Sequence, residues 1–181
     1  MAGFSLHAIG RDRPGIVAAL TGSLAGIGCN LIDSRMTILH RQFAVMIVLE
    51  APGIDDGTHI ERALEPIAEE LDVLVVVRPL PADDGWGAGD EAGESVVVSV
   101  HGADRPGTLA RVATEIAAAG GNIVDVLSRT VLGSEGPSCV MSLGVDLAPG
   151  RGGDSLAGRL AVAAGELGVE CTVAPAAPES R

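Results

Sequence analysis

The hydrophobic and polar positions of this chain follow the same order of patterns twice. In the first half, period-two or continuous apolar runs typical of strands alternate with apolar stripes of helical spacing. The order is strand, helix, strand, strand, helix, strand, over residues 4–9, 16–27, 30–39, 43–50, 60–71 and 73–77. The second half repeats it from a strand at 95–101 to one at 169–173, with a longer hairpin whose tip is at 133–137. This order predicts an α+β fold of two ferredoxin-like βαββαβ domains, each a four-stranded antiparallel sheet with two helices on one face.

The segments between these patterns predict how the helices begin and end. Gly28 and Gly120 follow the first helix of each half and are expected to terminate it in a left-handed conformation. Thr58 with Glu61 resembles a capping box at the start of the second helix. Pro66 lies inside that helix and predicts a kink or a split. In the second half the corresponding cap is expected at one of two neighbouring positions, Asp154 or Ser155.

A sequence repeat supports the duplication. GRDRPGIV at 10–17 recurs as GADRPGTL at 102–109, and GCNLID at 28–33 recurs as GGNIVD at 120–125. Ten of 27 positions are identical between 7–33 and 99–125 without a gap, which favours duplication over chance. We therefore predict a first domain over 1–78 and a second over 95–174. Between them, residues 79–94 have the Pro-, Gly- and acid-rich composition of a linker, and 175–181 are expected to form a flexible tail.

Composition and charge exclude several classes of function. The net charge is −12, and all 12 basic residues are Arg with no positive cluster, so direct binding to nucleic acid or to an anionic membrane is not expected. Three cysteines without CxxC spacing are typical of a reducing cytosol. The first residues do not resemble a signal peptide, and no apolar run reaches the roughly 18 residues that a membrane-spanning helix needs. We expect a cytoplasmic protein.

The turn G-x-D-R-P-G that precedes each first helix is the main candidate for chemistry. Asp12 occupies the expected N-cap position, and Pro14 is compatible with the first helical turn. The free amides and positive dipole end of such a helix suit a carboxylate. Asn30 and its counterpart Asn122 open the second strand and can donate or accept a hydrogen bond. Nearby carboxylates can balance an ammonium group, at Asp33 and Asp125.

Two alternatives remain open at this motif. The turn could be only a well-capped helix start. Arg13 and Arg105 could each grip a carboxylate bidentately, or each could pair with a nearby acid on a solvated face, and the second interpretation is favoured.

The pattern D-R-P-G, a helix, then G-x-N-[LI]-x-D in a βαββαβ frame resembles the ACT domain. The duplicated form resembles the glycine cleavage system transcriptional repressor family and related free-standing double-ACT proteins. This resemblance implies binding of a small amino acid between the first helix and second strand, usually at an interface between ACT domains. Carried over, the implied positions in the first half are Asp12, Arg13, Pro14, Gly15, Gly28, Asn30 and Leu31. In the second half they are Asp104, Arg105, Pro106, Gly107, Gly120, Asn122 and Ile123.

Residue types for catalysis are missing or scattered. The four histidines lack metal-ligand spacing, there is no lysine for a Schiff base or a Walker A loop, and no G-x-G-x-x-G follows a strand. We therefore expect no enzymatic activity, no metal and no cofactor. The leading hypothesis is a regulatory sensor that acts on a transcription-factor or enzyme partner. The alternatives are a protein-association scaffold with degenerate ligand sites, or a regulatory subunit of a separately encoded metabolic enzyme.

The strand at 43–50 predicts association. In FAVMIVLE both faces are apolar, whereas a sheet covered by helices on one face should alternate with polar residues on the other. We therefore expect the second face of the first sheet to be covered and the chain to form a homodimer.

Overall fold

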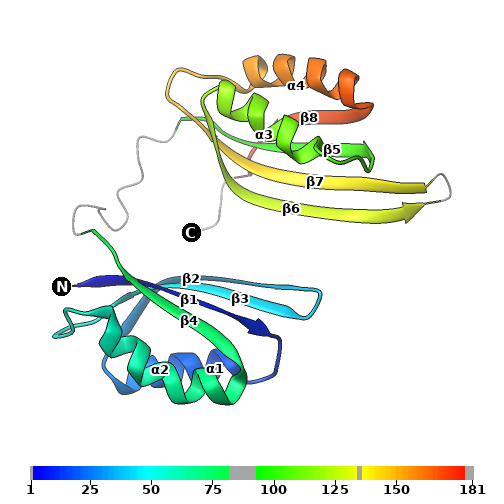
Figure 1. Cartoon of the computed structure of the whole chain (residues 1–181). Coiled ribbons are helices and arrows are strands. Elements are labelled where there is room, and N and C mark those ends of the chain that lie inside the picture. Colours follow the sequence, from blue (N-terminus) through cyan, green and yellow to red (C-terminus); the bar gives the residue numbers. More distant parts are fainter. Residues whose placement is uncertain (1, 82–92, 134–135, 178–181) are drawn as a thin grey trace. The chain divides into compact units, whose positions relative to one another are not determined.

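The structure is a computed structural model that describes residues 2–81, 93–133 and 136–177. The chain folds as two compact units, and each is described by itself (Figure 1). The first unit comprises β1 (Gly3–Arg11), α1 (Ile16–Gly26), β2 (Asn30–Leu39), β3 (Gln42–Glu50), α2 (Gly57–Leu71) and β4 (Val73–Pro79). The second comprises β5 (Ser95–Ala103), α3 (Thr108–Ala118), β6 (Gly121–Gly133), β7 (Gly136–Leu147), α4 (Gly153–Leu167) and β8 (Val169–Pro175). Of the predicted linker and tail, residues 82–92 and 178–181 lie outside the described residues.

Each unit contains one four-stranded sheet with both helices on one face (Figure 1). The strand orders are β2-β3-β1-β4 and β6-β7-β5-β8, and every pairing is antiparallel. The βαββαβ fold predicted for both halves is therefore confirmed. A register shift occurs at the same place in both edge strands, between Leu31 and Asp33 in β2 and between Ile123 and Asp125 in β6.

The core of each unit lies between the sheet and its helices. Alternate residues of β1 point to the helices, and Phe4, Leu6 and Ala8 are fully buried there. They pack against the apolar stripes of α1 and α2, which supply Ile16, Leu20, Leu24, Ile60 and Leu64. The second core is built in the same way from smaller residues, with Val96, Val98 and Val100 of β5 facing the helices. The apolar positions of strand period and those of helical period therefore face each other and form one buried layer in each unit.

The two second helices begin differently from the prediction. The cap of α2 is Asp56, not Thr58, because the Asp56 carboxylate accepts the backbone N–H of Thr58 at 3.0 Å. Glu61 does not close a capping box, since it accepts the backbone N–H of Val77 at 2.9 Å instead. A single helix runs through Pro66, so of the kink or split predicted there, the split is wrong.

In the second unit the cap of α4 is Gly152, so neither Asp154 nor Ser155 occupies that position. The side chain that serves the start of this helix comes from outside it. Glu94 accepts the backbone N–H of Gly153 at 2.9 Å. The sequence prediction missed this contact because Glu94 is 59 positions away in the chain.

The face of the first sheet without helices carries exposed apolar side chains. Ile9 is 53% exposed, Met46 47% and Leu74 65%. These residues occupy the β1, β3 and β4 positions that alternate with the buried ones. The prediction that β3 is apolar on both faces thus holds in the structure.

Candidate functional site

The D-R-P-G turn joins the end of β1 to the start of α1. Asp12 donates its backbone N–H to the carbonyl of Arg41 at 2.8 Å, which fastens the turn to the tip of the β2–β3 hairpin. The helix begins at Ile16, and its N-cap is Gly15 with φ of 95°. The prediction of Asp12 as N-cap is therefore wrong, and Pro14 precedes the helix instead of entering its first turn. Glycine is required because the cap residue has a left-handed backbone.

The start of α1 has free amide groups. No side chain caps it, and its first backbone bond is from Ala19 N to Gly15 O at 2.9 Å. Within the described part of the chain, the N–H groups of Ile16, Val17 and Ala18 therefore have no protein acceptor. Together with the helix dipole they attract an anion.

A groove of about 420 Å³ opens at this helix start. It is lined by Asp12, Arg13, Gly15, Ile16, Val17, Ala18, Met36 and Phe43. Arg13 adds a positive group, Asp12 adds a carboxylate, and Phe43 and Met36 provide an apolar floor. The groove thus combines anion donors, one anionic acceptor and an apolar surface, which together complement a small zwitterion.

The other predicted site residues of the first unit lie at the opposite end of the sheet. Asn30 pairs with Glu50, which pairs with Gly3 at the start of β1, whereas Asp12 follows the end of β1. The eight residue steps between Gly3 and Arg11 correspond to about 25 Å of strand. Within one unit, the structure therefore does not bring Asn30, Leu31 or Asp33 close to the D-R-P-G turn.

These residues at the start of β2 have local roles. Gly28 has φ of 80° and ends α1 as predicted, and Cys29 donates its backbone N–H to Leu24 O at 3.0 Å. At the register shift, the carboxylate of Asp33 accepts the backbone N–H of Ser34 at 2.7 Å. Asn30 itself is exposed.

The second unit repeats the arrangement with altered contacts. Gly107 is the N-cap of α3 with φ of 91°, so Asp104 is not the cap there either, and Pro106 again precedes the helix. The Asp104 carboxylate accepts the hydroxyl of Thr130 at 3.0 Å. Asn122 pairs with Asp146, which pairs with Ser95, so Asn122 and Ile123 are again at the far end of the sheet. Gly120 has φ of 81°, and Asp125 follows the register shift.

The two arginines of the turns do not form the ion pairs that the favoured interpretation expected. Among the described residues, Arg111 and Arg159 of α3 and α4 form ion pairs with glutamates, whereas neither Arg13 nor Arg105 is in such a pair. The guanidinium of Arg105 lies over Gly168, 3.9 Å from where a Cβ on that glycine would be. Gly168 ends α4, so Arg105 lies near the negative end of a helix dipole.

Groups for catalysis are not gathered at either turn. Burial raises the pKa of the Cys29 thiol, and burial together with Cys139 raises the pKa of Cys171. Such thiols stay protonated and are weak nucleophiles. In residues 2–81, 93–133 and 136–177 no cluster of His, Cys, Asp and Glu could hold a metal ion, and no helix is long and apolar enough to span a bilayer.

The fold is a tandem of two ferredoxin-like domains, and in the first of them a groove opens at the start of α1. Residues 5–78 match a family model described as ACT domain, and residues 96–147 match a second model of the same description. The chain belongs to the ACT-domain family and contains two ACT domains. The resemblance inferred from D-R-P-G and G-x-N is therefore confirmed.

Comparison with curated proteins and solved structures shows which ACT-domain proteins this chain is similar to. The chain is 34% identical to the glycine cleavage system transcriptional repressor of Escherichia coli over 133 residues, 69% of this chain and 63% of the relative. The match thus spans less than two thirds of the relative's length. A structure of an unknown protein from Galdieria sulphuraria covers 97% of this chain and 99% of its own, with a TM-score of 0.82 and 23% identity. A structure assigned to a glycine cleavage system transcriptional repressor shares the fold with a TM-score of 0.71, 18% identity and 96% coverage of both chains.

Proposed function

We propose that this chain is a regulatory sensor that binds a small amino acid at the start of α1 and acts on a partner protein, without catalytic activity of its own. The observation that carries the proposal is the groove of about 420 Å³ at an uncapped helix start. In the proposed complex the ligand carboxylate accepts hydrogen bonds from the backbone N–H groups of Val17 and Ala18, and the guanidinium of Arg13 lies beside it. The Asp12 carboxylate accepts the ligand ammonium.

Binding in the groove would also change the structure around it. It is lined by the turn, by α1 and by the hairpin strands β2 and β3, which a ligand would hold together. Because β2 is an exposed edge strand, its local stability is the property that ligand binding would change most. Asn30 and Asp33 join the site only where a second ACT domain brings them to the groove, which matches the interface position typical of the family. In the second unit the same proposal applies to Asp104, Arg105 and Gly107 with Asn122 and Asp125.

The partner is proposed to be a transcription factor or an enzyme of amino-acid metabolism in the cytoplasm. The similarity to a transcriptional repressor of the glycine cleavage system supports the first. Direct contact with DNA is disfavoured, because the net charge of −12 repels phosphate. A scaffold with degenerate ligand sites and a subunit of a separately encoded enzyme remain the competing functions.

A thermal-shift and calorimetric screen of the twenty amino acids tests the proposal. At a hundredfold excess over Kd a ligand adds about 2.7 kcal/mol, which raises Tm by roughly 5–10 °C. Asp12→Asn removes the ammonium partner and should weaken binding about tenfold or more. Arg78→Gln, on β4 and away from the groove, is the control and should bind normally. If none of the amino acids produces heat or a thermal shift, the scaffold is the better explanation.

A further inference from the structure

The outer edge of β4 has unpaired backbone groups. β4 ends the strand order of the first sheet, so only its β1 side is paired. The N–H of Val77 points away from β1, since it donates to Glu61. In an antiparallel pair these directions alternate, so the backbone groups of Val73 and Val75 also point outward. Among the described residues, no other chain segment pairs with this edge.

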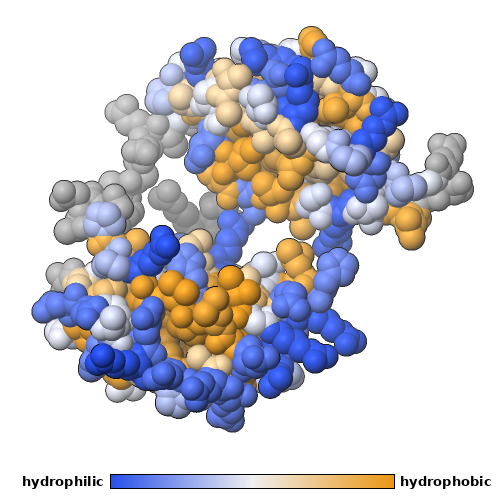
Figure 2. Space-filling model, viewed as in Figure 1, coloured by the Kyte–Doolittle hydropathy of each residue, from blue (hydrophilic) through white to orange (hydrophobic). Residues whose placement is uncertain are grey.

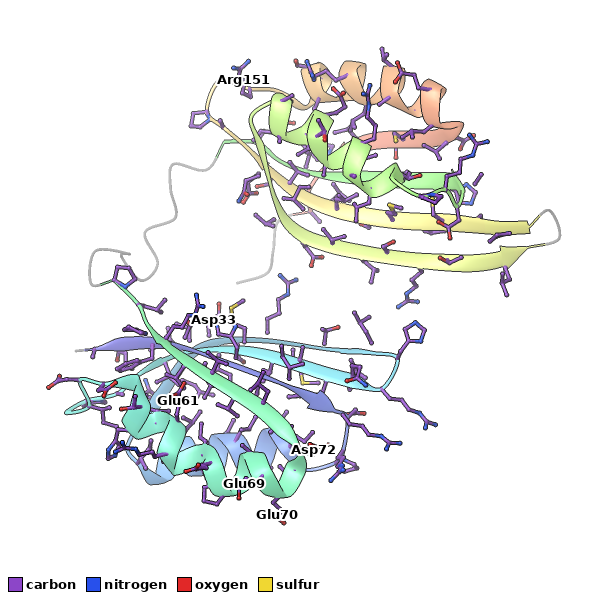
Figure 3. The ribbon with its side chains drawn as sticks, viewed as in Figure 1. Asp33, Glu61, Glu69, Glu70, Asp72 and Arg151 are labelled. Carbon is purple, nitrogen blue, oxygen red and sulfur yellow. The ribbon has the colours of Figure 1, made fainter. Side chains whose placement is uncertain are left out.

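A groove of about 450 Å³ runs along this edge, between β4 and the flank of α2. On the helix side it is lined by Thr58, Glu61, Arg62, Glu65 and Ala68, and on the strand side by Val73, Leu74 and Val75. Figure 2 shows an apolar patch over β4, and Figure 3 shows Glu61 on α2 beside β4. The Glu61 carboxylate occupies the position that a neighbouring strand's carbonyl would take at Val77, which demonstrates that α2 side chains reach this edge.

The second unit provides an internal comparison. α2 and α4 are both 15 residues long and follow the same order of elements, so they align without a gap. Glu61, Glu65 and Glu69 align with Ala157, Ala161 and Gly165. The fold alone therefore does not require carboxylates at these helix positions, and in the first unit Glu61 and Glu65 line the groove together with Arg62.

We propose that the β4 edge of the first unit binds an extended segment of a partner protein, added as a fifth strand, in which basic and apolar side chains alternate. Strand addition supplies backbone hydrogen bonds at Val73 and Val75, and displaces Glu61 from Val77. This extends the proposed partner-directed function by naming the chemistry of a partner contact.

The alternation of basic and apolar residues in the added strand follows from the spacing of the carboxylates on α2. Glu61 and Glu65 are four residues apart on a helix, a rise of about 6 Å, and alternate residues of a strand are about 6.6 Å apart. Basic residues at positions i and i+2 of the added strand can therefore each meet one carboxylate. Its other side chains point to the opposite face of the sheet, where Leu74 and Val76 are exposed and apolar.

The probe is a short fluorescein-labelled peptide of alternating Arg and Val, titrated with the full chain in the absence of free amino acids. We expect saturable anisotropy that weakens with salt, and no binding of a peptide of alternating Glu and Val. Slower amide exchange at Val75 on peptide addition should report the new hydrogen bonds. Since no amino acid is present, this result is independent of whether the α1 groove binds one.

Two variants and a control locate the contact. Glu65→Arg changes an exposed side chain and should reduce affinity about tenfold or more. Val75→Pro removes the outward N–H but no bond to β1, as edge strands tolerate, and should also abolish binding. Cys171→Pro makes the same change at the aligned position of β8 and should leave binding intact. If the wild-type chain does not bind the peptide, or if Glu65→Arg binds it normally, the proposal is wrong and Glu61 only shields the edge.

Discussion

Asp56 stabilises the start of α2 through two contacts with one residue. Thr58 donates its hydroxyl and its backbone N–H to the carboxylate, and these bonds hold the pKa of Asp56 below its ordinary value of 3.8. Because the pKa is lower in the folded state, the stabilisation is present above the unfolded pKa and is lost as the pH falls through the folded one.

We therefore predict that Asp56→Ala lowers the Tm at neutral pH, since the cap is lost. Asp56→Asn should retain most of the Tm, because Asn also caps well. Circular-dichroism melts from pH 7 to pH 2.5 measure both effects. The gap between wild type and Asp56→Ala should narrow in acid, and a gap that stays constant with pH would show that the charge has no part in it.

Glycine at the end of β1 is required by close packing, not by a ligand. A Cβ on Gly10 would lie 2.6 Å from Cγ1 of Val73 and 2.7 Å from the carbonyl oxygen of Asp72. At the aligned Gly102 a Cβ would lie 2.8 Å from Cα of Val169. The first glycine of both G-x-D-R-P-G motifs thus allows the last strand of each unit to start against the first.

At the scale of the element, Gly10→Ala should therefore destabilise the first unit by about 1–3 kcal/mol, as overpacking does. Gly22→Ala is the matched control, because a Cβ there meets nothing within 4 Å and alanine favours the helix. Urea unfolding monitored by circular dichroism measures the unfolding midpoint of each variant. Equal midpoints for both variants would mean that β4 can move away from Gly10 at no cost.

The elements themselves were predictable because apolar stripes of helical spacing alternate with short apolar runs typical of strands. β2 begins and ends at the predicted residues, and the glycines after α1 and α3 have the expected positive φ. The helix caps were not predictable for two reasons. Asp56 caps α2 from two residues before Thr58, and local spacing does not distinguish this from a capping box of Thr58 and Glu61. Glu94 reaches the start of α4 from 59 positions away in the chain.

Of the candidate site, the sequence predicted the D-R-P-G turn but not the distance of Asn30 from it, and the reason is the path of the chain. The D-R-P-G turn does lie at a groove. An α-helix that follows an antiparallel central strand returns along it, so α1 carries the chain back and β2 starts beside the beginning of β1. Motifs separated by one helix, such as those of Asp12 and Asn30, are therefore placed at opposite ends of a sheet.

At the scale of the whole molecule, charge and apolar surface act together. The net charge of −12 keeps chains apart at long range, so a contact between copies needs a surface where apolar burial outweighs repulsion. The helix-free face of the first sheet carries exposed apolar side chains that such a contact could bury. Ile9 pairs with Leu74 on one side, and Met46 lies diagonally across from Ile9, so the exposed apolar side chains are neighbours.

The last prediction is that this face is covered in a homodimer. Small domains bury a limited share of their surface and gain stability from a partner, and a contiguous apolar face of this kind marks an interaction site. Light scattering at micromolar concentration should give the mass of two chains. Met46→Glu places a charge within the face and should shift the mass towards one chain. Val162→Glu, on an equally apolar but isolated position of α4 that is 65% exposed, should leave it unchanged. A wild-type chain that is monomeric under these conditions would contradict the dimer, and would leave the face to another molecule or to the second ACT domain.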